Sequence, residues 1–229
     1  MTPSPTLLQS LPLLQSLPQV MIAELAKQSQ VKEFNKREVV IEKGAPLLSL
    51  FFLLEGRLQG VDFTIDGKEV GTSFTDPLDF FGELGVVDSD PHPETVIAIA
   101  KSRVLAIPRN VIRPLLVGMP SMAESLVLRL SRKLREANEQ RRILGLANPL
   151  QKVCAQLIIL SRHAPNSSLI PDMPTHQELA IMINASRETV TRVFQLLQGQ
   201  GLVLRDGNHL RIRQTLVLRE IAEGLREAP

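Results

Sequence analysis

Two helix-start signals lie eleven residues apart near the C-terminus, and no other feature of this sequence constrains the fold as tightly. The segment Thr175-His176-Gln177-Glu178 is a capping box, in which the threonine hydroxyl accepts from a first-turn N–H and the glutamate reaches back. Ser186 is a second cap residue. Apolar residues recur at helical spacing after both caps, at Leu179, Ala180, Ile183, Val190, Val193, Phe194 and Leu197. The pattern predicts a helix-turn-helix, with its turn at Asn184-Ala185.

The second helix of such a motif would place its first two turns in the major groove of DNA. Arginine can bond O6 and N7 of guanine, and glutamate can accept from N4 of cytosine. We therefore predict that bases are read by Arg187, Glu188 and Arg192. Backbone N–H groups and hydroxyls at helix starts suit phosphate contacts, and the residues predicted for that role are Thr175, His176, Gln177, Ser186, Thr189 and Arg205.

The segment Leu202–Arg213 alternates around Asp206-Gly207 and predicts a hairpin. Arg205 and His209 would lie near its tip, beside the DNA backbone, as in a winged helix. Each of these signals is common by itself, and the region can also be read as a small helical lobe with ordinary caps. The capping box, the spacing, the Arg-Glu-x-x-x-Arg pattern and the wing together favour DNA binding.

A long helix is predicted from about Met119 to Leu146, followed by a second helix from about Pro149 to Ser161. Apolar residues of the long helix recur in steps of three and four, interrupted only at Arg141, and charged residues flank them. Such a seam can pack on its own domain, but its length and its charged flanks favour a two-stranded coiled coil. The predicted homodimer seam consists of Val127, Leu130, Leu134, Ala137 and Leu144.

The pattern of residues from about Val31 to Ile107 predicts β-strands. Short apolar runs at 39–41, 50–54, 61–65 and 96–100 are separated by turn signals such as Asp66-Gly67. Their regular spacing predicts a small barrel or jelly-roll. The hexapeptide Leu-Leu-Gln-Ser-Leu-Pro occurs twice in tandem, at 7–12 and 13–18, and predicts short helical turns that lie on this domain.

Composition and charge exclude several classes of protein. The single cysteine, Cys154, rules out an intrachain disulfide, an all-cysteine zinc site and a cysteine-held iron–sulfur cluster. No apolar run approaches a membrane span, and no Lys or Arg precedes Lys27, so we expect no membrane segment, no signal peptide and a cytoplasmic protein. Residues 101–162 carry a net charge of +9, against −7 for residues 1–100, which predicts either a module that faces a polyanion or a solvated basic helix.

Several stretches resemble the cyclic-AMP receptor protein / fumarate–nitrate regulator (CRP/FNR) family. Residues 175–180 and 185–194 resemble its DNA-binding motif. Residues 41–44, 54–56, 66–69 and 77–85 resemble its cyclic-nucleotide-binding β-roll. The resemblance implies an α+β fold in three parts: an effector-sensing β-roll over 1–118, a central dimerisation helix over 119–148, and a winged helix-turn-helix over 149–229.

The resemblance also implies an allosterically controlled homodimer on a palindromic DNA site. In the receptor-protein branch, the residues that match Arg187, Glu188 and Arg192 read a TGTGA-like half-site. RNA polymerase is an implied partner, since the loop His163–Pro174 lies where family members can touch it. Activation and repression cannot be told apart from these residues.

The implied effector pocket includes Gly82, Glu83, Leu84, Glu94 and Thr95. Members that bind cyclic AMP carry an Arg-Ser pair about ten residues after Gly-Glu-Leu, where this chain has Pro93 and Glu94. Proline offers no donor, and a carboxylate about 4 Å from a phosphate diester costs a few kcal/mol. The Thr-Ser pair that contacts adenine is also missing, since no Thr lies between Thr95 and Thr175. We therefore expect cyclic AMP to be disfavoured.

These residues are compatible with several effectors. Cyclic di-GMP could use Arg103, Arg109, Arg113 or the arginines of the long helix; a small organic ligand, or no ligand, is an equal alternative. A haem would need His92, the only histidine in the β region. A cupin enzyme would need a histidine cluster for its metal, so we expect no catalytic and no metal-binding residues. A regulatory subunit that does not bind DNA would not need the paired helices.

Overall fold

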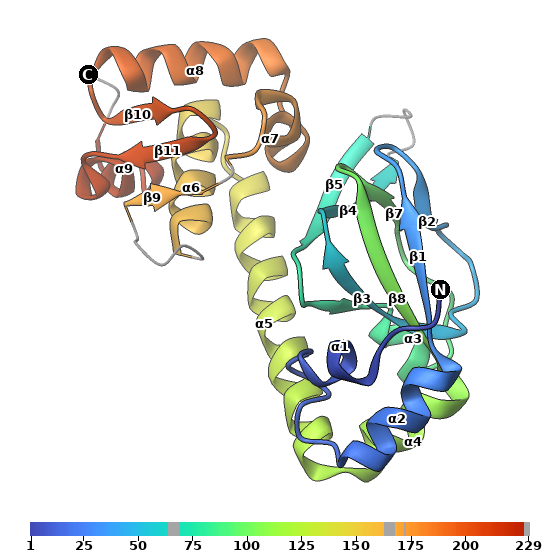
Figure 1. The fold of residues 1–229 in the computed structure, drawn as a ribbon. Coiled ribbons are helices and arrows are strands. Elements are labelled where there is room, and N and C mark those ends of the chain that lie inside the picture. Colours follow the sequence, from blue (N-terminus) through green and yellow to red (C-terminus); the bar gives the residue numbers. More distant parts are fainter. Residues whose placement is uncertain (64–68, 163–167, 172, 227–229) are drawn as a thin grey trace. The chain divides into compact units, whose positions relative to one another are not determined.

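The computed structural model describes residues 1–63, 69–162, 168–171 and 173–226 (Figure 1). The chain combines helices with sheets, in agreement with the predicted α+β class, and forms two compact units, Met1–Lys133 and Leu134–Pro229. The boundary falls inside the long helix α5 (Pro120–Leu144), which the resemblance implied to be a separate segment over 119–148. The turn expected at Asp66-Gly67 and half of the loop 163–174 (residues 163–167 and 172) lie outside the described residues.

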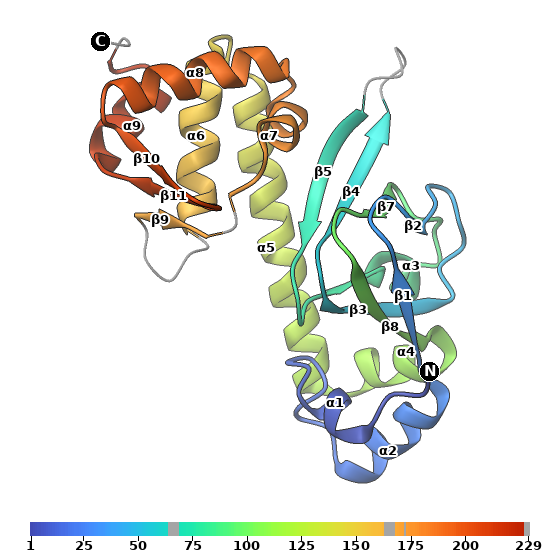
Figure 2. The same ribbon diagram turned by 45° about the horizontal axis from the view of Figure 1, so that its top comes forward.

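The N-terminal unit is built on two antiparallel four-stranded sheets that pack face to face (Figure 2). One sheet has the order β1 (Gln30–Phe34), β8 (Ser102–Pro108), β3 (Ser49–Glu55) and β6 (Phe80–Phe81); the other has β2 (Val39–Ile41), β7 (Thr95–Ala98), β4 (Leu58–Phe63) and β5 (Glu69–Thr75). Both contribute to one core, made of Ile41, Leu47, Leu53, Leu58, Phe81, Val96, Ala98 and Val104. The short apolar runs thus form a two-sheet roll, as their regular spacing predicts.

The tandem leucine repeat covers the outer face of the first sheet. It forms α1 (Pro5–Gln9) and a succession of turns, followed by α2 (Gln19–Gln28). Leu8, Leu11 and Leu14 are completely buried in a second core that also holds residues of β3, β8 and α4 (Arg109–Gly118). The repeat therefore consists of helical turns lying on the domain, as predicted.

We expect Leu11→Ala to lower the free energy of unfolding by about 2–5 kcal/mol, because it removes a fully buried side chain and leaves a cavity. Val20, on α2, is 77% exposed, so Val20→Ala should cost less than about 0.5 kcal/mol. Urea unfolding followed by circular dichroism measures both. Equal losses in the two variants would show that the repeat is not part of the core.

Helix α5 begins at Pro120, where the missing N–H of proline costs no intrahelical hydrogen bond. Two ion pairs tie this helix to the turn before β6 and to α3 (Glu83–Val87). Arg129 Nη2 lies 2.5 Å from Asp79 Oδ2, and Lys133 Nζ lies 3.0 Å from Glu83 Oε1. Burial raises the pKa of Asp79, and the guanidinium of Arg129 opposes that shift.

The C-terminal unit contains the predicted pair of helices and hairpin. Its elements are α6 (Pro149–Arg162), β9 (Leu169–Ile170), α7 (His176–Ile183), α8 (Arg187–Gly199), β10 (Val203–Asp206), β11 (His209–Ile212) and α9 (Thr215–Ala222). The residues expected to be buried in α7 and α8 are buried. Strand β9 pairs with β11 inside a segment that the sequence marked only as a loop. Burial raises the pKa of Cys154 to about 12, which makes its thiol inert at neutral pH.

Within the described ranges, no single helix is both long and apolar enough to cross a membrane, although α4 and α5 meet the length and composition criteria as a pair bent by 96°. Ile112 and Leu116 of α4 are buried in the core of the N-terminal unit. In the same ranges, no three His, Cys, Asp or Glu side chains are grouped so that they could hold a metal ion.

Candidate nucleic-acid interface and effector cavity

Both helix starts of the helix-turn-helix are capped as the sequence predicts. Thr175 Oγ1 accepts from the N–H of Glu178 at 3.2 Å, and the Thr175 N–H donates to Glu178 Oε2 at 2.6 Å. Ser186 Oγ accepts from the N–H of Thr189 at 3.1 Å. Asn184 has a φ of 50°, a left-handed conformation that asparagine tolerates and that ends α7. The caps leave other first-turn N–H groups of both helices without intrahelical partners, and such groups can donate to phosphates.

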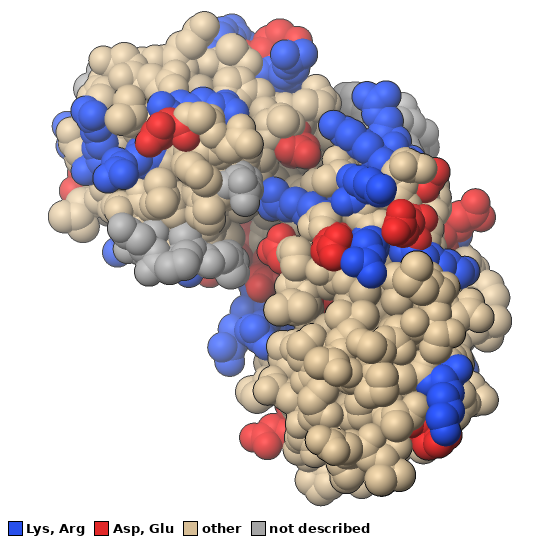
Figure 3. Space-filling view, viewed as in Figure 1, with Lys and Arg blue, Asp and Glu red and all other residues tan. Residues whose placement is uncertain are grey.

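The three predicted base-reading side chains lie together on the exposed N-terminal part of α8. Arg187, Glu188 and Arg192 are all exposed. Arg192 Nη2 lies 3.4 Å from Thr189 Oγ1, which directs the guanidinium toward the first turn. The pKa of Glu188 is lowered by its own backbone N–H, by the Ser186 hydroxyl and by the two arginines, so it is an ionised acceptor. Figure 3 shows basic and acidic side chains side by side at the end of α8 nearest α7.

His176, at the start of α7, packs its ring against α8. Its ring stacks on Phe194, with centroids 4.7 Å apart, and its Nδ1 lies 2.9 Å from Thr191 Oγ1. The Thr191 hydroxyl donates to the Arg187 carbonyl, so we infer that His176 Nδ1 carries the proton of this contact. Burial, and then Arg205 and Arg187, lower the pKa of His176. The neutral ring then has no proton on Nε2 to offer a phosphate, and only its backbone N–H suits that role.

The predicted wing is present as the β10–β11 hairpin. Asp206 pairs with His209, and Gly207 between them has a φ of 59°, which favours glycine in this tight turn. Arg205 is exposed, and its Nε donates to the Gly207 carbonyl at 3.3 Å. This contact holds the arginine stem along the turn. Gln177 is exposed in the first turn of α7.

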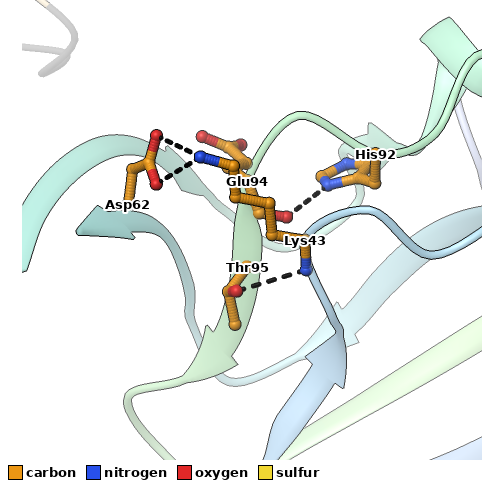
Figure 4. Close-up of polar contacts among 5 residues, drawn as sticks. All are labelled: Lys43, Asp62, His92, Glu94 and Thr95. Carbon is orange, nitrogen blue, oxygen red and sulfur yellow. Dashed lines mark hydrogen bonds and ion pairs between the residues drawn. The ribbon is translucent and has the colours of Figure 1, made fainter. Parts of the chain in front are cut away.

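The predicted effector residues mostly surround one small cavity in the N-terminal unit. Its volume is about 40 Å³, and its lining includes Gly82, Glu83, Leu84 and Glu94. Thr95 lies beside the cavity, where its Oγ1 accepts from the N–H of Lys43 at 3.2 Å (Figure 4). A cavity of this volume holds a few water molecules, whereas drug-sized ligands occupy about 300–1,000 Å³.

Side chains of the protein itself occupy the polar positions of this cavity. Ser73 Oγ donates to Glu94 Oε1 at 2.9 Å, and Lys133 reaches the buried Glu83. A Cβ on Gly60 would lie 2.5 Å from the Glu94 carboxylate, so a larger residue at this position would displace the carboxylate from its present place. Ser73 and Lys133 were missed by the sequence reasoning, and no local motif marks them, since their roles depend on the packing of β5 and α5.

Most of the side chains that were considered as ligands for haem or cyclic di-GMP form hydrogen bonds or ion pairs with other residues of the protein. His92 is buried, and its Nδ1 lies 2.6 Å from the Glu94 carbonyl, as Figure 4 shows. Arg103 Nη1 lies 2.6 Å from Glu55 Oε1. Arg109 Nε donates to the Val86 carbonyl at 3.0 Å, and its Nη2 contacts Ser89. Arg113 is exposed on α4.

The predicted dimer seam divides into exposed and packed positions. Val127 is 60% exposed, Leu134 64% and Leu144 37%, and Ala137 is also exposed. Leu130 instead packs on the core of the N-terminal unit. Helix α5 therefore carries a row of exposed apolar side chains, with Leu130 turned partly toward its own unit.

Comparisons with known proteins agree with this architecture. Residues 31–117 match the model of the cyclic nucleotide-binding domain, and residues 151–221 match that of the Crp-like helix-turn-helix domain. A CRP-like cAMP-activated global transcriptional regulator of Mycobacterium tuberculosis is 27% identical over 196 residues, covering 83% of this chain and 87% of the relative. The cyclic AMP receptor protein of Thermus thermophilus is 28% identical over 177 residues, with coverages of 77% and 81%.

The solved structure of FixK2 from Bradyrhizobium japonicum has the same fold, with a TM-score of 0.73 and 20% identity over 84% of this chain and 96% of that chain. Regulators of this kind bind DNA through their helix-turn-helix and function as dimers. With both domains matched in the same order and along most of the length of such regulators, this chain belongs to the CRP/FNR family of transcription regulators.

Proposed function

We propose that this protein is a sequence-specific transcription regulator that binds a palindromic TGTGA-like DNA site as a homodimer. The observation that carries the proposal is the exposed start of α8, where Arg187, Glu188 and Arg192 lie around the Ser186 cap. Two guanidiniums and one ionised carboxylate supply donors for guanine and an acceptor for cytosine. A TGTGA half-site and its complement contain both bases.

Phosphate contacts would fix the protein on the duplex. We assign them to the backbone N–H groups of His176 and Gln177 at the start of α7, to the Ser186 and Thr189 hydroxyls, and to Arg205 in the wing. Thr175 contributes by holding the first helix start in place through its capping box. RNA polymerase is the further partner that we expect at the promoter.

The class of the protein is tested by a gel shift at low salt on a duplex with TGTGA-N6-TCACA. Retarded migration is the result that the proposal predicts, since non-specific attraction adds to base reading under these conditions. A ligand-binding regulatory subunit without DNA binding would leave the duplex unshifted.

The effector, on this proposal, is not cyclic AMP in the usual mode, although the two relatives named above bear cyclic AMP in their names. The cavity of about 40 Å³ is too small for a nucleotide, and Glu94 places a carboxylate in it. The Glu83–Lys133 ion pair joins this cavity to α5 without any ligand. These contacts support an N-terminal unit that binds no effector in this cavity. The ion pair of Arg103 and the hydrogen bonds of Arg109 count against cyclic di-GMP at this face.

Calorimetry with cyclic AMP is expected to give no micromolar binding to the native protein. The double variant Pro93→Arg, Glu94→Ser should bind at least about a hundredfold more tightly, because repulsion is exchanged for an ion pair worth a few kcal/mol. Glu94→Gln is the matched control, since it removes the charge alone and should give a smaller gain. Micromolar affinity of the native protein would contradict the proposed effector mode.

A further inference from the structure

A second cavity lies in the C-terminal unit, away from the helix-turn-helix and the wing. It has a volume of about 280 Å³ and is lined by the end of α5 with the segment after it, by α6 and by α9. Its apolar floor consists of Ile143, Leu146, Ala155, Ile158, Ile159 and Ala222. None of the roles assigned above uses this cavity.

Three arginines from three different helices line the same cavity. Arg142 comes from α5, Arg162 from α6 and Arg219 from α9, and Glu223 is the only acidic residue among the described residues that line it. Arg162 Nη1 donates to Glu139 Oε1 at 2.7 Å. In the described part of the chain, the side chains of Arg142 and Arg219 have no ion pair or hydrogen bond with another residue. An arginine near a helix C-terminus complements the helix dipole, but that effect does not bring three of them to one apolar cavity.

We propose that this cavity binds a small amphipathic carboxylate, such as a medium-chain fatty acid. The apolar floor would bury the hydrocarbon part, which contributes about 0.8 kcal/mol per buried CH₂. Arg142 and Arg219 would receive the carboxylate, because guanidinium donors match its two oxygens. The volume lies just below the range of drug-sized pockets, about 300–1,000 Å³, and so favours a small ligand over a cyclic dinucleotide.

Isothermal titration calorimetry of the full chain with octanoate tests the proposal without DNA. We expect saturable binding, and about tenfold weaker binding for Arg142→Gln and for Arg219→Gln, because each removes a charged hydrogen-bond donor. Ala222→Leu should weaken binding by narrowing the cavity. Arg213→Gln is the matched control, since Arg213 is exposed in the same unit and does not line the cavity. The affinity of this variant for octanoate should equal that of the native protein.

Three matched probes distinguish binding at this site from non-specific hydrophobic binding. Octan-1-ol lacks the carboxylate, octylamine reverses the charge, and acetate lacks the apolar part, so each should bind at least about tenfold more weakly than octanoate. No octanoate binding would overturn the proposal, as would equal binding of octanol or unchanged affinity in both arginine variants. Circular dichroism establishes that every variant is folded. A failure here leaves the DNA-binding proposal unaffected, because the two sites share no residue.

Discussion

Replacing Arg187 with alanine is expected to weaken binding to a TGTGA-N6-TCACA duplex by about ten- to hundredfold for each half-site. A bidentate arginine–guanine contact contributes about 1–3 kcal/mol of discrimination, which converts to that range. Arg187 is exposed in the first turn of α8 and its side chain makes no competing hydrogen bond among the described residues, so its loss should not disturb the fold. Fluorescence anisotropy at fixed salt concentration measures the change.

The matched control for this variant is Arg226→Ala. Arg226 is exposed in the same unit and lies 3.5 Å from Glu220, so the substitution removes the same charge away from α8. The control should change affinity only slightly and leave sequence preference intact. Equal weakening in both variants would mean that Arg187 acts through charge alone and reads no base.

Leu134→Glu is expected to convert the protein from a dimer to a monomer at micromolar concentration. Leu134 is 64% exposed on α5 within a seam of apolar residues, and in a two-stranded coiled coil it would face a partner helix. The substitution removes apolar contact and brings two carboxylates together. We therefore expect the dissociation constant of the dimer to rise at least about a hundredfold, which corresponds to about 2.7 kcal/mol. Sedimentation velocity measures the oligomeric state.

Leu128→Glu provides a closely matched control for that experiment. Leu128 is 56% exposed on the same helix but lies outside the seam. This variant should remain dimeric, and its DNA affinity should be unchanged. A monomeric native protein, or a Leu134→Glu variant that stays dimeric, would contradict the proposed seam.

The helix-turn-helix could be predicted in detail because its signals are local in sequence. Thr175 and Ser186 each bond a backbone N–H three residues away, so both caps are fixed by neighbours in the chain. The wing turn at Asp206-Gly207 is equally local. The strands of the roll could be recognised as short apolar runs between turn signals, and the repeat as helical turns that lie on the domain.

The polar contacts of the first cavity could not be predicted, because they join distant parts of the chain. Glu83 and Lys133 are fifty residues apart in sequence, and only the packing of α5 beside α3 brings them within 3.0 Å. The sequence did indicate that Glu94 stands where a phosphate-binding residue is expected. It did not indicate that the Ser73 hydroxyl would donate a hydrogen bond to the Glu94 carboxylate. Likewise, the stacking of the His176 ring on Phe194 joins side chains of two different helices, and no local motif marks that contact.

The central claim is that the chain reads a specific palindrome, and a comparison of two duplexes tests it most directly. Fluorescence anisotropy of the full chain is measured on TGTGA-N6-TCACA and on a scrambled duplex of the same length and composition, in the same salt. We predict tighter binding to the palindrome by about a thousandfold or more, as specific regulators show, with two chains per duplex. Equal affinity for the two duplexes, at any salt concentration, would contradict sequence-specific recognition.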